Sequence, residues 1–217
     1  MSQKKSAIIF GSTGLVGGLL LEQLVADERY GEIKIFVRKP TGNKNNKVDE
    51  IILDTKKLDD FRKLVKADEV FCCLGTTIKT AGSQEKFRSV DYELVRWCAV
   101  CAKENGVKSF LVVSSLGAFA DSANFYYKVK GEMEKAVSVL GFEKCVILRP
   151  SMLMGKRKEF RFGELIGQFV MTFFWIFIPP KYKAISGRRV AKAMIFAANN
   201  ESVDGILESN VIRKIGK

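Results

Sequence analysis

The chain has 217 residues, with 36 Lys and Arg against 24 Asp and Glu, a formal net charge of +12, and no histidine. Its 47% hydrophobic and 28% charged content is that of a globular protein with a sizeable core. The lack of histidine excludes Ser-His-Asp and Cys-His catalysis and histidine metal sites. The positive charge favours a phosphate-rich ligand or an anionic surface. Because the basic residues are scattered without interleaved aromatics, we expect no nucleic-acid partner.

The cysteines and the first residues bear on where the protein works. The chain has five cysteines, an odd number, mostly in apolar runs, so we predict reduced thiols. Cys98-x-x-Cys101 has no second pair and no histidine, so we interpret it as core packing and expect no metal site. Met1–Ser6 is polar and basic, which leaves no room for a signal peptide before the first strand. We therefore expect a cytoplasmic protein.

Apolar runs typical of strands alternate with helical patterns along the first two thirds of the chain. The predicted strands are Ala7–Phe10, Ile33–Val37, Glu50–Leu53, Glu69–Leu74, Ser109–Val113 and Cys145–Leu148. The predicted helices are Leu15–Ala26, Leu58–Lys66, Lys86–Asn105 and Phe125–Leu140. Near-continuous apolar strands between helices predict an α/β fold, with a doubly wound parallel sheet that has helices on both faces.

A glycine-rich turn follows the first strand and opens the first helix: Gly11-Ser12-Thr13-Gly14-Leu15-Val16-Gly17-Gly18. This GxxGxxG spacing, in a strand–turn–helix context, predicts a dinucleotide site. Gly11 can turn tightly, Gly14 lets the backbone approach a pyrophosphate, and Gly17 lets helix and strand pack closely. The helix N-terminus offers N–H groups and partial positive charge to the phosphates. The alternative is a glycine-rich turn without a ligand.

The end of the second strand bears on the choice of dinucleotide. NAD-binding proteins commonly place an acidic residue there, which accepts a hydrogen bond from the ribose 2′-OH. This chain has Arg38-Lys39 instead, and a guanidinium pairs well with a 2′-phosphate. We therefore predict NADP(H); the alternative is a pair of solvated loop cations.

Two further strand ends suit the adenosine half of the cofactor, because ligands of such sheets lie across the carboxyl ends of the strands. Asp54-Thr55 follows the third predicted strand, and Leu74-Gly75-Thr76 ends the fourth. Asp54 and Thr76 are equally suited to capping turns.

A reacting centre is predicted from the end of the fifth strand and the helix that follows. Tyr126 and Lys130 share a helix face at i and i+4 spacing, and a nearby ammonium favours the tyrosine phenolate. Ser115 ends the strand, where it can hydrogen-bond a substrate carbonyl. The predicted catalytic residues are therefore Ser115, Tyr126 and Lys130. Their competitors are Ser114, Tyr127 and Lys128.

The pattern changes after Pro150. Leu165–Pro180 carries no charge, is too short for a comfortable transmembrane helix, and ends at Pro179-Pro180. It is interpreted as a buried helix of a small subdomain. The alternatives are a subunit interface or peripheral membrane contact, through Leu165–Ile178. Gly187–Asn199 predicts a further helix, and Ile206–Ile215 includes a late strand.

Taken together, these motifs resemble the short-chain dehydrogenase/reductase superfamily, and within it the Tat-interacting-protein-like oxidoreductases of the atypical branch. The finer resemblance is carried by Phe71–Thr77, Asn124–Glu132 and Leu148-Arg149-Pro150, and it extends over nearly the whole chain. It implies a single NAD(P)-binding Rossmann domain over residues 1–217, with 151–190 contributing a small C-terminal substrate or interface subdomain.

The resemblance also implies roles for particular residues. It places the triad on Ser115, Tyr126 and Lys130, and the passage of the nicotinamide near Leu153. It implies phosphate or anionic-group contacts at Thr13, Gly14, Leu15, Val16, Arg38, Lys39 and Arg161. Many members use a helix asparagine for proton relay, and the candidate position here is Asp91.

The favoured function is an NADPH-dependent oxidoreductase that reduces a carbonyl of a small, apolar substrate, with Tyr126 as proton donor. The alternative is a non-catalytic NADPH-binding regulatory protein that contacts a protein partner or a membrane surface. A monomer and a homodimer are both compatible with the sequence.

Overall fold

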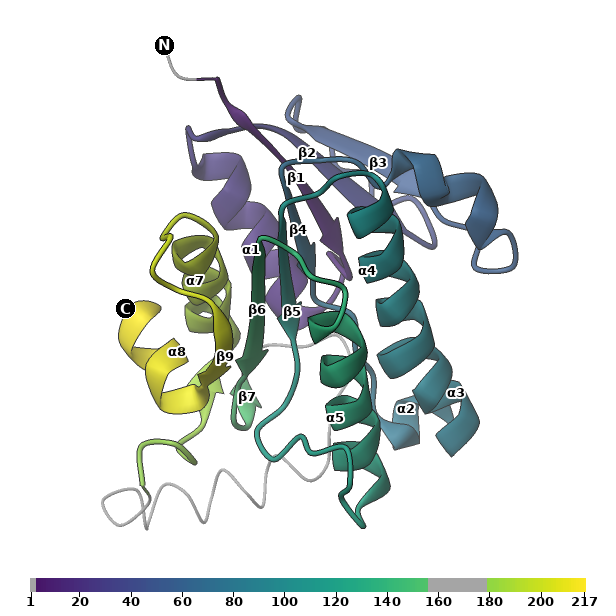
Figure 1. The fold of residues 1–217 in the computed structure, drawn as a ribbon. Coiled ribbons are helices and arrows are strands. Elements are labelled where there is room, and N and C mark those ends of the chain that lie inside the picture. Colours follow the sequence, from purple (N-terminus) through teal and green to yellow (C-terminus); the bar gives the residue numbers. More distant parts are fainter. Residues whose placement is uncertain (1–2, 156–178) are drawn as a thin grey trace.

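The computed structural model describes residues 3–155 and 179–217, which form a twisted sheet between two layers of helices (Figure 1). The sheet is seven-stranded, in the order β3-β2-β1-β4-β5-β6-β9, and its paired strands are parallel. The strands are β1 (Lys5–Phe10), β2 (Tyr30–Val37), β3 (Val48–Ile52), β4 (Glu69–Cys72), β5 (Ser109–Val113), β6 (Lys144–Arg149) and β9 (Gly205–Glu208). The predicted doubly wound parallel sheet is confirmed.

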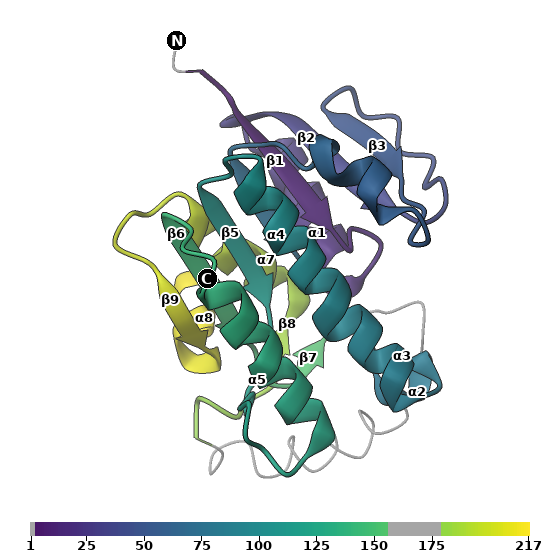
Figure 2. The same ribbon diagram turned by 45° about the vertical axis from the view of Figure 1, so that its right-hand side comes forward.

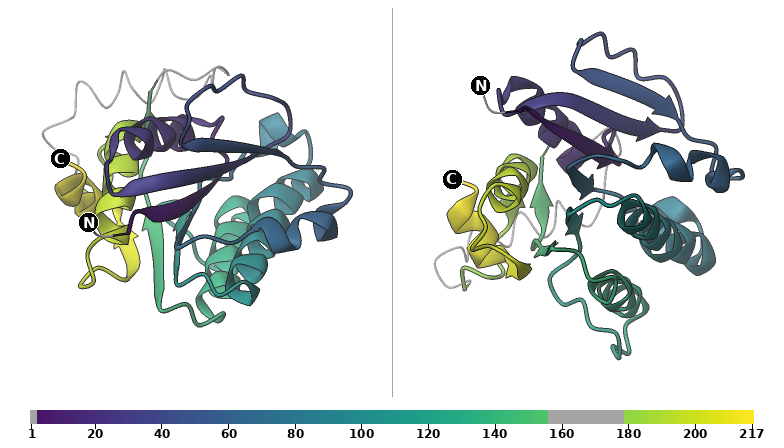
Figure 3. Two further views of the ribbon diagram at one scale, coloured as in Figure 1. Left: turned by 90° about the horizontal axis from the view of Figure 1, so that it is seen from above. Right: turned by 45° about the horizontal axis from the view of Figure 1, so that its top comes forward.

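The helices divide between the two faces of the sheet. On one face lie α1 (Leu15–Ala26), α7 (Gly187–Ala198) and α8 (Ser209–Ile215). On the other lie η1 (Leu58–Leu64), α4 (Val95–Glu104) and α5 (Phe125–Ser138). Figure 2 brings α4 and α5 in front of the sheet, and Figure 3 shows the two layers on either side of it.

Burial explains why the strands are apolar on both faces. In β1, Ala7 and Ile9 pack in the cluster under α1 and α7, whereas Ile8 and Phe10 pack in the cluster under α4 and α5. A parallel strand covered by helices on both faces has no solvent-facing side, so apolar and polar residues do not alternate along it. The two clusters make the core and fix the carboxyl edge of the sheet, where β1, β4 and β5 end.

The segment predicted as one helix over Lys86–Asn105 is helical but not uniform. It consists of α3 (Gln84–Arg88), a π-helical turn η2 (Ser89–Leu94) and α4. The prediction for Leu58–Lys66 also differs, because η1 is a 3-10 helix. A short helix, α2 (Ile78–Ala81), was not predicted; it is capped by the Thr77 side chain, which accepts from Thr80 N.

The C-terminal part returns to the main sheet. After β6 come the short parallel strands β7 (Leu153–Met154) and β8 (Ile185–Ser186). α7 then packs against α1, and β9 supplies the predicted late strand. Most of Leu165–Pro180 lies outside the described residues, so the interpretations of that segment stay predictions, as does the subdomain over 151–190. None of the described helices has both the length and the apolar character needed to cross a membrane.

Candidate dinucleotide and reaction site

The glycine turn leaves space for no side chain at two of its positions. Gly11 has φ +82°, and a Cβ there would lie 2.7 Å from the Cys73 carbonyl oxygen. A Cβ on Gly17 would lie 2.2 Å from the Gly11 carbonyl oxygen. Both distances are shorter than any real carbon–oxygen contact, so the turn brings β1, α1 and the end of β4 together only because these residues are glycines.

The turn fits an anionic group. Gly14 is the N-cap of α1 and supplies no side-chain cap, and the first turn of the helix carries no acidic residue. The Ser12 hydroxyl is buried and has no hydrogen-bond partner among the described residues. Backbone N–H groups at a helix N-terminus and a buried hydroxyl are donors that a phosphate satisfies. Thr13 and Gly14 are exposed, so the turn is open to solvent on that side.

Leu15 joins the turn to the C-terminal segment. A Cβ on Gly155 would lie 2.5 Å from Leu15 Cδ1, and a Cβ on Gly187 would lie 2.9 Å from Leu15 Cγ. The Leu15 side chain is thus packed against the end of β7 and the start of α7. Its backbone amide is the part that suits a phosphate, as is that of Val16, whose side chain is buried in the cluster under α1 and α7. Leu153 is half-buried in β7 beside this contact, and Arg161 lies outside the described residues.

The residues predicted for the adenosine half line the ends of β2 and β3. Arg38 and Lys39 directly follow β2 and are exposed, as are Asp54 and Thr55 after β3. Asp54 Oδ1 accepts a hydrogen bond from Lys56 N at 2.9 Å, so this carboxylate caps a turn, which is the structural alternative the sequence left open. Arg38 and Lys39 remain accessible to an anionic ligand.

The loop after β4, Leu74-Gly75-Thr76, runs from the glycine turn to the predicted catalytic residue Lys130. Thr76 N donates to Asp91 Oδ2 at 2.8 Å. A Cβ on Gly75 would lie 3.4 Å from Asp91 Oδ1 and 3.6 Å from Lys130 Nζ, so the backbone passes close to both charged groups. Thr76 therefore contacts Asp91 through its backbone amide.

Lys130 lies in a buried ion pair. Its Nζ is 2.7 Å from Asp91 Oδ1, and the two side chains are 4% and 0% exposed. Burial by itself lowers the pKa of Lys130, but the charges of Asp91 and Tyr126 outweigh that effect and raise it. Lys130 is consequently an ammonium at neutral pH. Because Asp91 comes from η2, the ion pair also joins η2 to α5.

Tyr126 lies in the first turn of the same helix. Asn124 caps α5 by accepting from Tyr126 N and Tyr127 N. The Tyr126 ring packs 5.4 Å from the ring of buried Phe87, while its neighbour Tyr127 is 37% exposed and covers Gly117. Tyr126 and Lys130 are therefore both held by side-chain packing, as a reacting pair requires.

The two serines after β5 have different surroundings. Ser114 is buried and donates to Glu134 Oε1 at 2.5 Å, and Glu134 in turn accepts from Arg149 at 2.5 and 2.9 Å. Ser115 is half-buried, and its hydroxyl makes a long hydrogen bond to the Leu116 carbonyl at 3.3 Å. The Ser114 hydroxyl is engaged in this buried network, whereas the Ser115 hydroxyl makes only this one long hydrogen bond within the described residues.

The cysteines belong to the core. Cys98 and Cys101 are buried on α4 under the sheet. Burial raises the pKa of Cys98, and raises the pKa of Cys101 to about 11. Over residues 3–155 and 179–217, no group of three or more cysteine and acidic side chains is placed to hold a metal ion.

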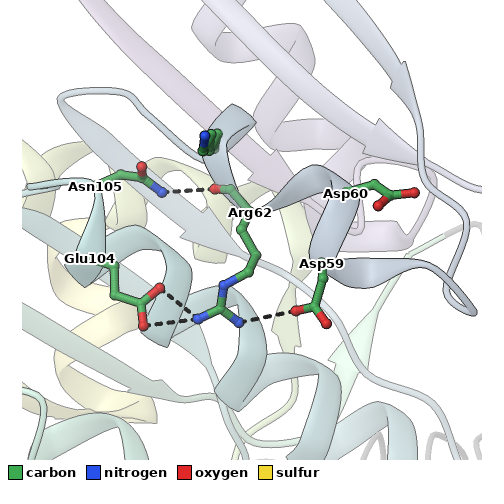
Figure 4. Close-up of a pocket in the computed structure, with 6 residues that line it drawn as sticks. Asp59, Asp60, Arg62, Glu104 and Asn105 are labelled. Carbon is green, nitrogen blue, oxygen red and sulfur yellow. Dashed lines mark hydrogen bonds and ion pairs between the residues drawn. The ribbon is translucent and has the colours of Figure 1, made fainter.

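A separate hollow of about 490 Å³ lies between η1 and the end of α4 (Figure 4). Its central Arg62 pairs with Glu104 at 2.6 Å and with Asp59 at 3.5 Å, and Asn105 Nδ2 donates to the Arg62 carbonyl at 2.8 Å. α4 ends here and leads into β5, so this hollow lies at the amino edge of the sheet, away from the glycine turn. Four of its lining residues, Asp59, Arg62, Glu104 and Asn105, bond to one another, and we assign the hollow no ligand.

Sequence reasoning missed part of this arrangement. It named Asp91 only as a position for a relay residue, and it did not predict the ion pair with Lys130 or the Ser114–Glu134–Arg149 network. One signal was present: Phe87, Asp91 and Val95 follow one another at i and i+4 spacing on the buried side of a helical segment. A carboxylate on an apolar stripe requires a partner.

Fold and site define a dinucleotide-binding protein of the Rossmann type, and the comparisons agree. The NAD(P)H-binding family matches residues 11–173. Protein FMP52, mitochondrial, of Debaryomyces hansenii is 33% identical over 97% of this chain and 94% of its own length. Protein HTATIP2 of Rattus norvegicus is 34% identical over 76% of this chain and 70% of its own length. The chain belongs to this NAD(P)H-binding family, in the atypical short-chain dehydrogenase/reductase branch of HTATIP2 and FMP52.

Solved structures agree on the fold. A UDP-N-acetylglucosamine 4-epimerase from Methanobrevibacter ruminantium M1 superposes with a TM-score of 0.73, covering 95% of this chain and 76% of the epimerase, at 17% identity. At this identity the likeness concerns the fold and leaves open the choice between NAD and NADP.

The expectation of a cytoplasmic protein is wrong. The Debaryomyces relative and two further relatives of the same name are called mitochondrial. The expectation rested on the odd number of cysteines in apolar runs and on the lack of an apolar signal peptide. Mitochondrial targeting segments are amphipathic and basic, so that criterion does not detect them.

Proposed function

We propose that the chain is an NADPH-dependent oxidoreductase that reduces a carbonyl group of a small, apolar substrate. The observation that carries the proposal is the buried Lys130 ammonium on the same face of α5 as Tyr126, joined through Asp91 to the loop after β4. That loop lies beside the glycine turn, because a Cβ on Gly11 would touch Cys73. The arrangement supports an acid–base pair beside a dinucleotide site without histidine.

The cofactor residues have separate tasks in this proposal. The amides of Leu15 and Val16 and the hydroxyls of Ser12 and Thr13 hold the pyrophosphate. Gly14, whose amide donates to the Gly11 carbonyl at 3.0 Å, lets the backbone approach it. Arg38 and Lys39 hold the 2′-phosphate, because no carboxylate follows β2 at that point to repel it. NADPH supplies the hydride when it is bound.

The protein's own residues orient the carbonyl and supply the proton. Ser115 donates a hydrogen bond to the carbonyl oxygen and positions it. Tyr126 gives its phenolic proton to that oxygen as negative charge develops there. Lys130 favours the resulting phenolate and binds the nicotinamide ribose.

Tyr126→Phe tests the proposal. The substitution keeps the ring against Phe87 and removes only the proton donor. Turnover is measured with a panel of carbonyl compounds and monitored through NADPH absorbance. We expect it to fall roughly 10²- to 10⁴-fold, with NADPH affinity nearly unchanged. Tyr127→Phe is the matched control and should retain turnover. Undiminished turnover in Tyr126→Phe would contradict the mechanism, and NADPH binding without turnover of any carbonyl would favour the regulatory alternative.

Arg38→Ala tests the cofactor preference. Loss of a guanidinium–phosphate contact should weaken NADPH binding by roughly tenfold or more and leave NADH binding unchanged, measured by fluorescence titration. NADH is the internal control, because it lacks the 2′-phosphate. Equal NADPH affinity in the variant and the parent would show that Arg38 is a solvated loop cation.

A further inference from the structure

Two arginines that the proposed function does not use come together where α7 contacts α8. α7 also contacts α1, so it has a neighbour on each side in this helical layer (Figure 1). Arg189 lies in the first turn of α7, and Arg213 lies on α8. The two helices pack closely, because a Cβ on Gly216 would lie 2.1 Å from the Arg189 carbonyl oxygen. Gly216 follows Arg213 by three residues, so this packing brings Arg213 to the start of α7.

The Arg213 guanidinium is held by the segment that leads into β8. Its Nη2 donates to the carbonyl oxygens of Lys183 at 2.6 Å and Ala184 at 2.9 Å. Its Nε is buried and has no hydrogen-bond partner in the part of the chain that the structure describes. A buried N–H of a charged group is costly to leave without an acceptor. The guanidinium is therefore fixed in orientation while one of its donors lacks an acceptor.

No carboxylate balances these two charges. Among the described residues, neither Arg189 nor Arg213 forms an ion pair with an acidic side chain, whereas the adjacent Arg188 pairs with Glu22 on α1 at 3.3 Å. Burial, followed by the charge of Arg189, lowers the pKa of Arg213. The two guanidiniums therefore repel each other, and an anion bound between them would relieve that repulsion.

A third positive charge lies along the same contact. Lys192 follows Arg189 by about one turn of α7, and its Nζ donates to the Lys217 carbonyl oxygen at 2.8 Å. The sequences of α7 and α8 contain no aspartate or glutamate. Both helices thus contribute positive charge to this contact, and neither contributes an acidic side chain.

We propose that Arg189 and Arg213 bind a phosphate group at the contact between α7 and α8. A planar guanidinium pairs with phosphate oxygens through two parallel N–H···O bonds, and two guanidiniums match the charge of a phosphate monoester. A soluble phosphate compound and a lipid headgroup both present this chemistry. The site is separate from the glycine turn, because it lies on the α8 side of α7 while Arg188 and Glu22 occupy the α1 side. The proposal does not depend on the proposed reductase activity.

The test titrates the full-length protein with inorganic phosphate at constant ionic strength, followed by calorimetry. We expect Arg189→Gln to weaken phosphate binding about tenfold or more, because a charge-assisted hydrogen bond to the ligand is lost. Arg188→Gln removes an equal charge from the adjacent position and is the matched control, which should keep the parent affinity. Phosphate bound at the glycine turn contributes equally to the parent and to both variants.

A conservative variant separates charge from geometry. Arg189→Lys keeps the charge but loses the planar fork, so its phosphate affinity should lie between those of the parent and Arg189→Gln. The Arg189 side chain makes no hydrogen bond within the described residues, so we expect these variants to fold. Parent-like phosphate affinity in Arg189→Gln overturns the proposal, and so do equal losses in Arg189→Gln and Arg188→Gln. Neither result bears on the proposed reaction, which fails instead if Tyr126→Phe retains full turnover.

Vesicles distinguish the two sources of the phosphate group. The parent and both glutamine variants are sedimented with phosphatidylcholine vesicles that either contain or lack phosphatidic acid. Co-sedimentation that requires phosphatidic acid and is lost in Arg189→Gln but not in Arg188→Gln supports a lipid headgroup as the ligand. Binding of inorganic phosphate without co-sedimentation supports a soluble phosphate compound. Binding of neither inorganic phosphate nor phosphatidic acid overturns the proposal, as does co-sedimentation that Arg189→Gln leaves unchanged.

Discussion

Strand β4 has a buried carboxylate close to each of its ends, and each carboxylate pairs with a lysine. At the amino end, Glu69 Oε1 lies 2.6 Å from Lys5 Nζ, and Glu69 Oε2 accepts from the Tyr30 hydroxyl at 2.6 Å. Beyond the carboxyl end, Asp91 pairs with Lys130 and accepts from Thr76 N. The two clusters use the same chemistry at opposite edges of one sheet.

The lysines differ in their access to water. The Lys5 side chain is 38% exposed, whereas that of Lys130 is 4% exposed. The Glu69 cluster is completed by Asn199, which donates to the Tyr30 hydroxyl at 2.7 Å, so its groups serve one another. The Asp91 cluster instead includes Tyr126 and the loop after β4. A buried ion pair whose partners also face a place for a ligand is a candidate reaction site, whereas one whose groups serve one another is structural.

Removing each carboxylate in turn should give the largest loss of unfolding free energy and distinguish the ion pairs at the two edges of the sheet. Asp91→Ala leaves the Lys130 charge buried without a partner and should cost about 3–5 kcal/mol of unfolding free energy. Glu69→Ala should cost about 1–3 kcal/mol, because Lys5 can turn to water. Denaturant unfolding measures both. Equal losses would show that exposure of the lysine does not control the difference.

Adding a single methyl group to a glycine at each edge should give the next largest effect. A Cβ on Gly17 would lie 2.2 Å from the Gly11 carbonyl oxygen, so Gly17→Ala must displace the glycine turn. We expect NADPH affinity to fall about 100-fold, which is about 2.7 kcal/mol of binding free energy.

Gly141→Ala, between α5 and β6 at the amino edge, is the control. Gly141 has φ +69°, and a Cβ there would meet no atom within 4 Å. Its cost should be about 1 kcal/mol of stability without a change in NADPH affinity. Parent-like affinity in Gly17→Ala would contradict the role given to the turn.

The smallest predicted effect is a pH dependence at the amino edge. Burial, followed by the charge of Glu69, raises the pKa of Tyr30 well above its usual value of about 10. Tyr30 in the unfolded chain loses its proton near pH 10 while folded Tyr30 keeps it, so stability present below that pH is lost as the pH rises further. The slope should be about 1.4 kcal/mol per pH unit.

Tyr30→Phe should remove this part of the slope in unfolding measured above pH 10. Tyr182→Phe, at a side chain that is 54% exposed, is the control and should keep the parent slope. An unchanged slope in Tyr30→Phe would show that the folded protein does not hold the Tyr30 phenol protonated.

Much of the fold could be predicted from local sequence pattern. The strands β1, β2, β4, β5 and β6 and the helices α1, α5 and α7 lie where apolar periodicity placed them, within a few residues. The π-helical turn η2 could not be predicted in this way. It places Asp91 in contact with Lys130 and Thr76, which are distant in sequence.

The candidate site divides similarly. The glycine turn is a local motif. The structure agrees with the predicted roles of Gly11 in a tight turn and of Gly17 in close packing, because a Cβ at either position would clash with backbone atoms. The hydrogen bond from Ser114 to Glu134 required the tertiary structure, because the two residues come from different elements; the catalytic role of Ser115 stays a prediction. Arg38 and Lys39 follow β2 as predicted, and their role with a 2′-phosphate stays a prediction.

By itself, the sequence determined the parallel sheet, the glycine turn and the pairing of Tyr126 with Lys130 on one helix face. These features depend on neighbours within a few residues, where the periods of strand and helix apply. Only the tertiary structure decided that Lys130 is buried against Asp91, that Glu69 forms a similar pair at the opposite edge, and that Leu15 packs on Gly155 and Gly187. Burial and electrostatic pairing are set by residues far apart in the chain, so they follow from packing and not from local pattern.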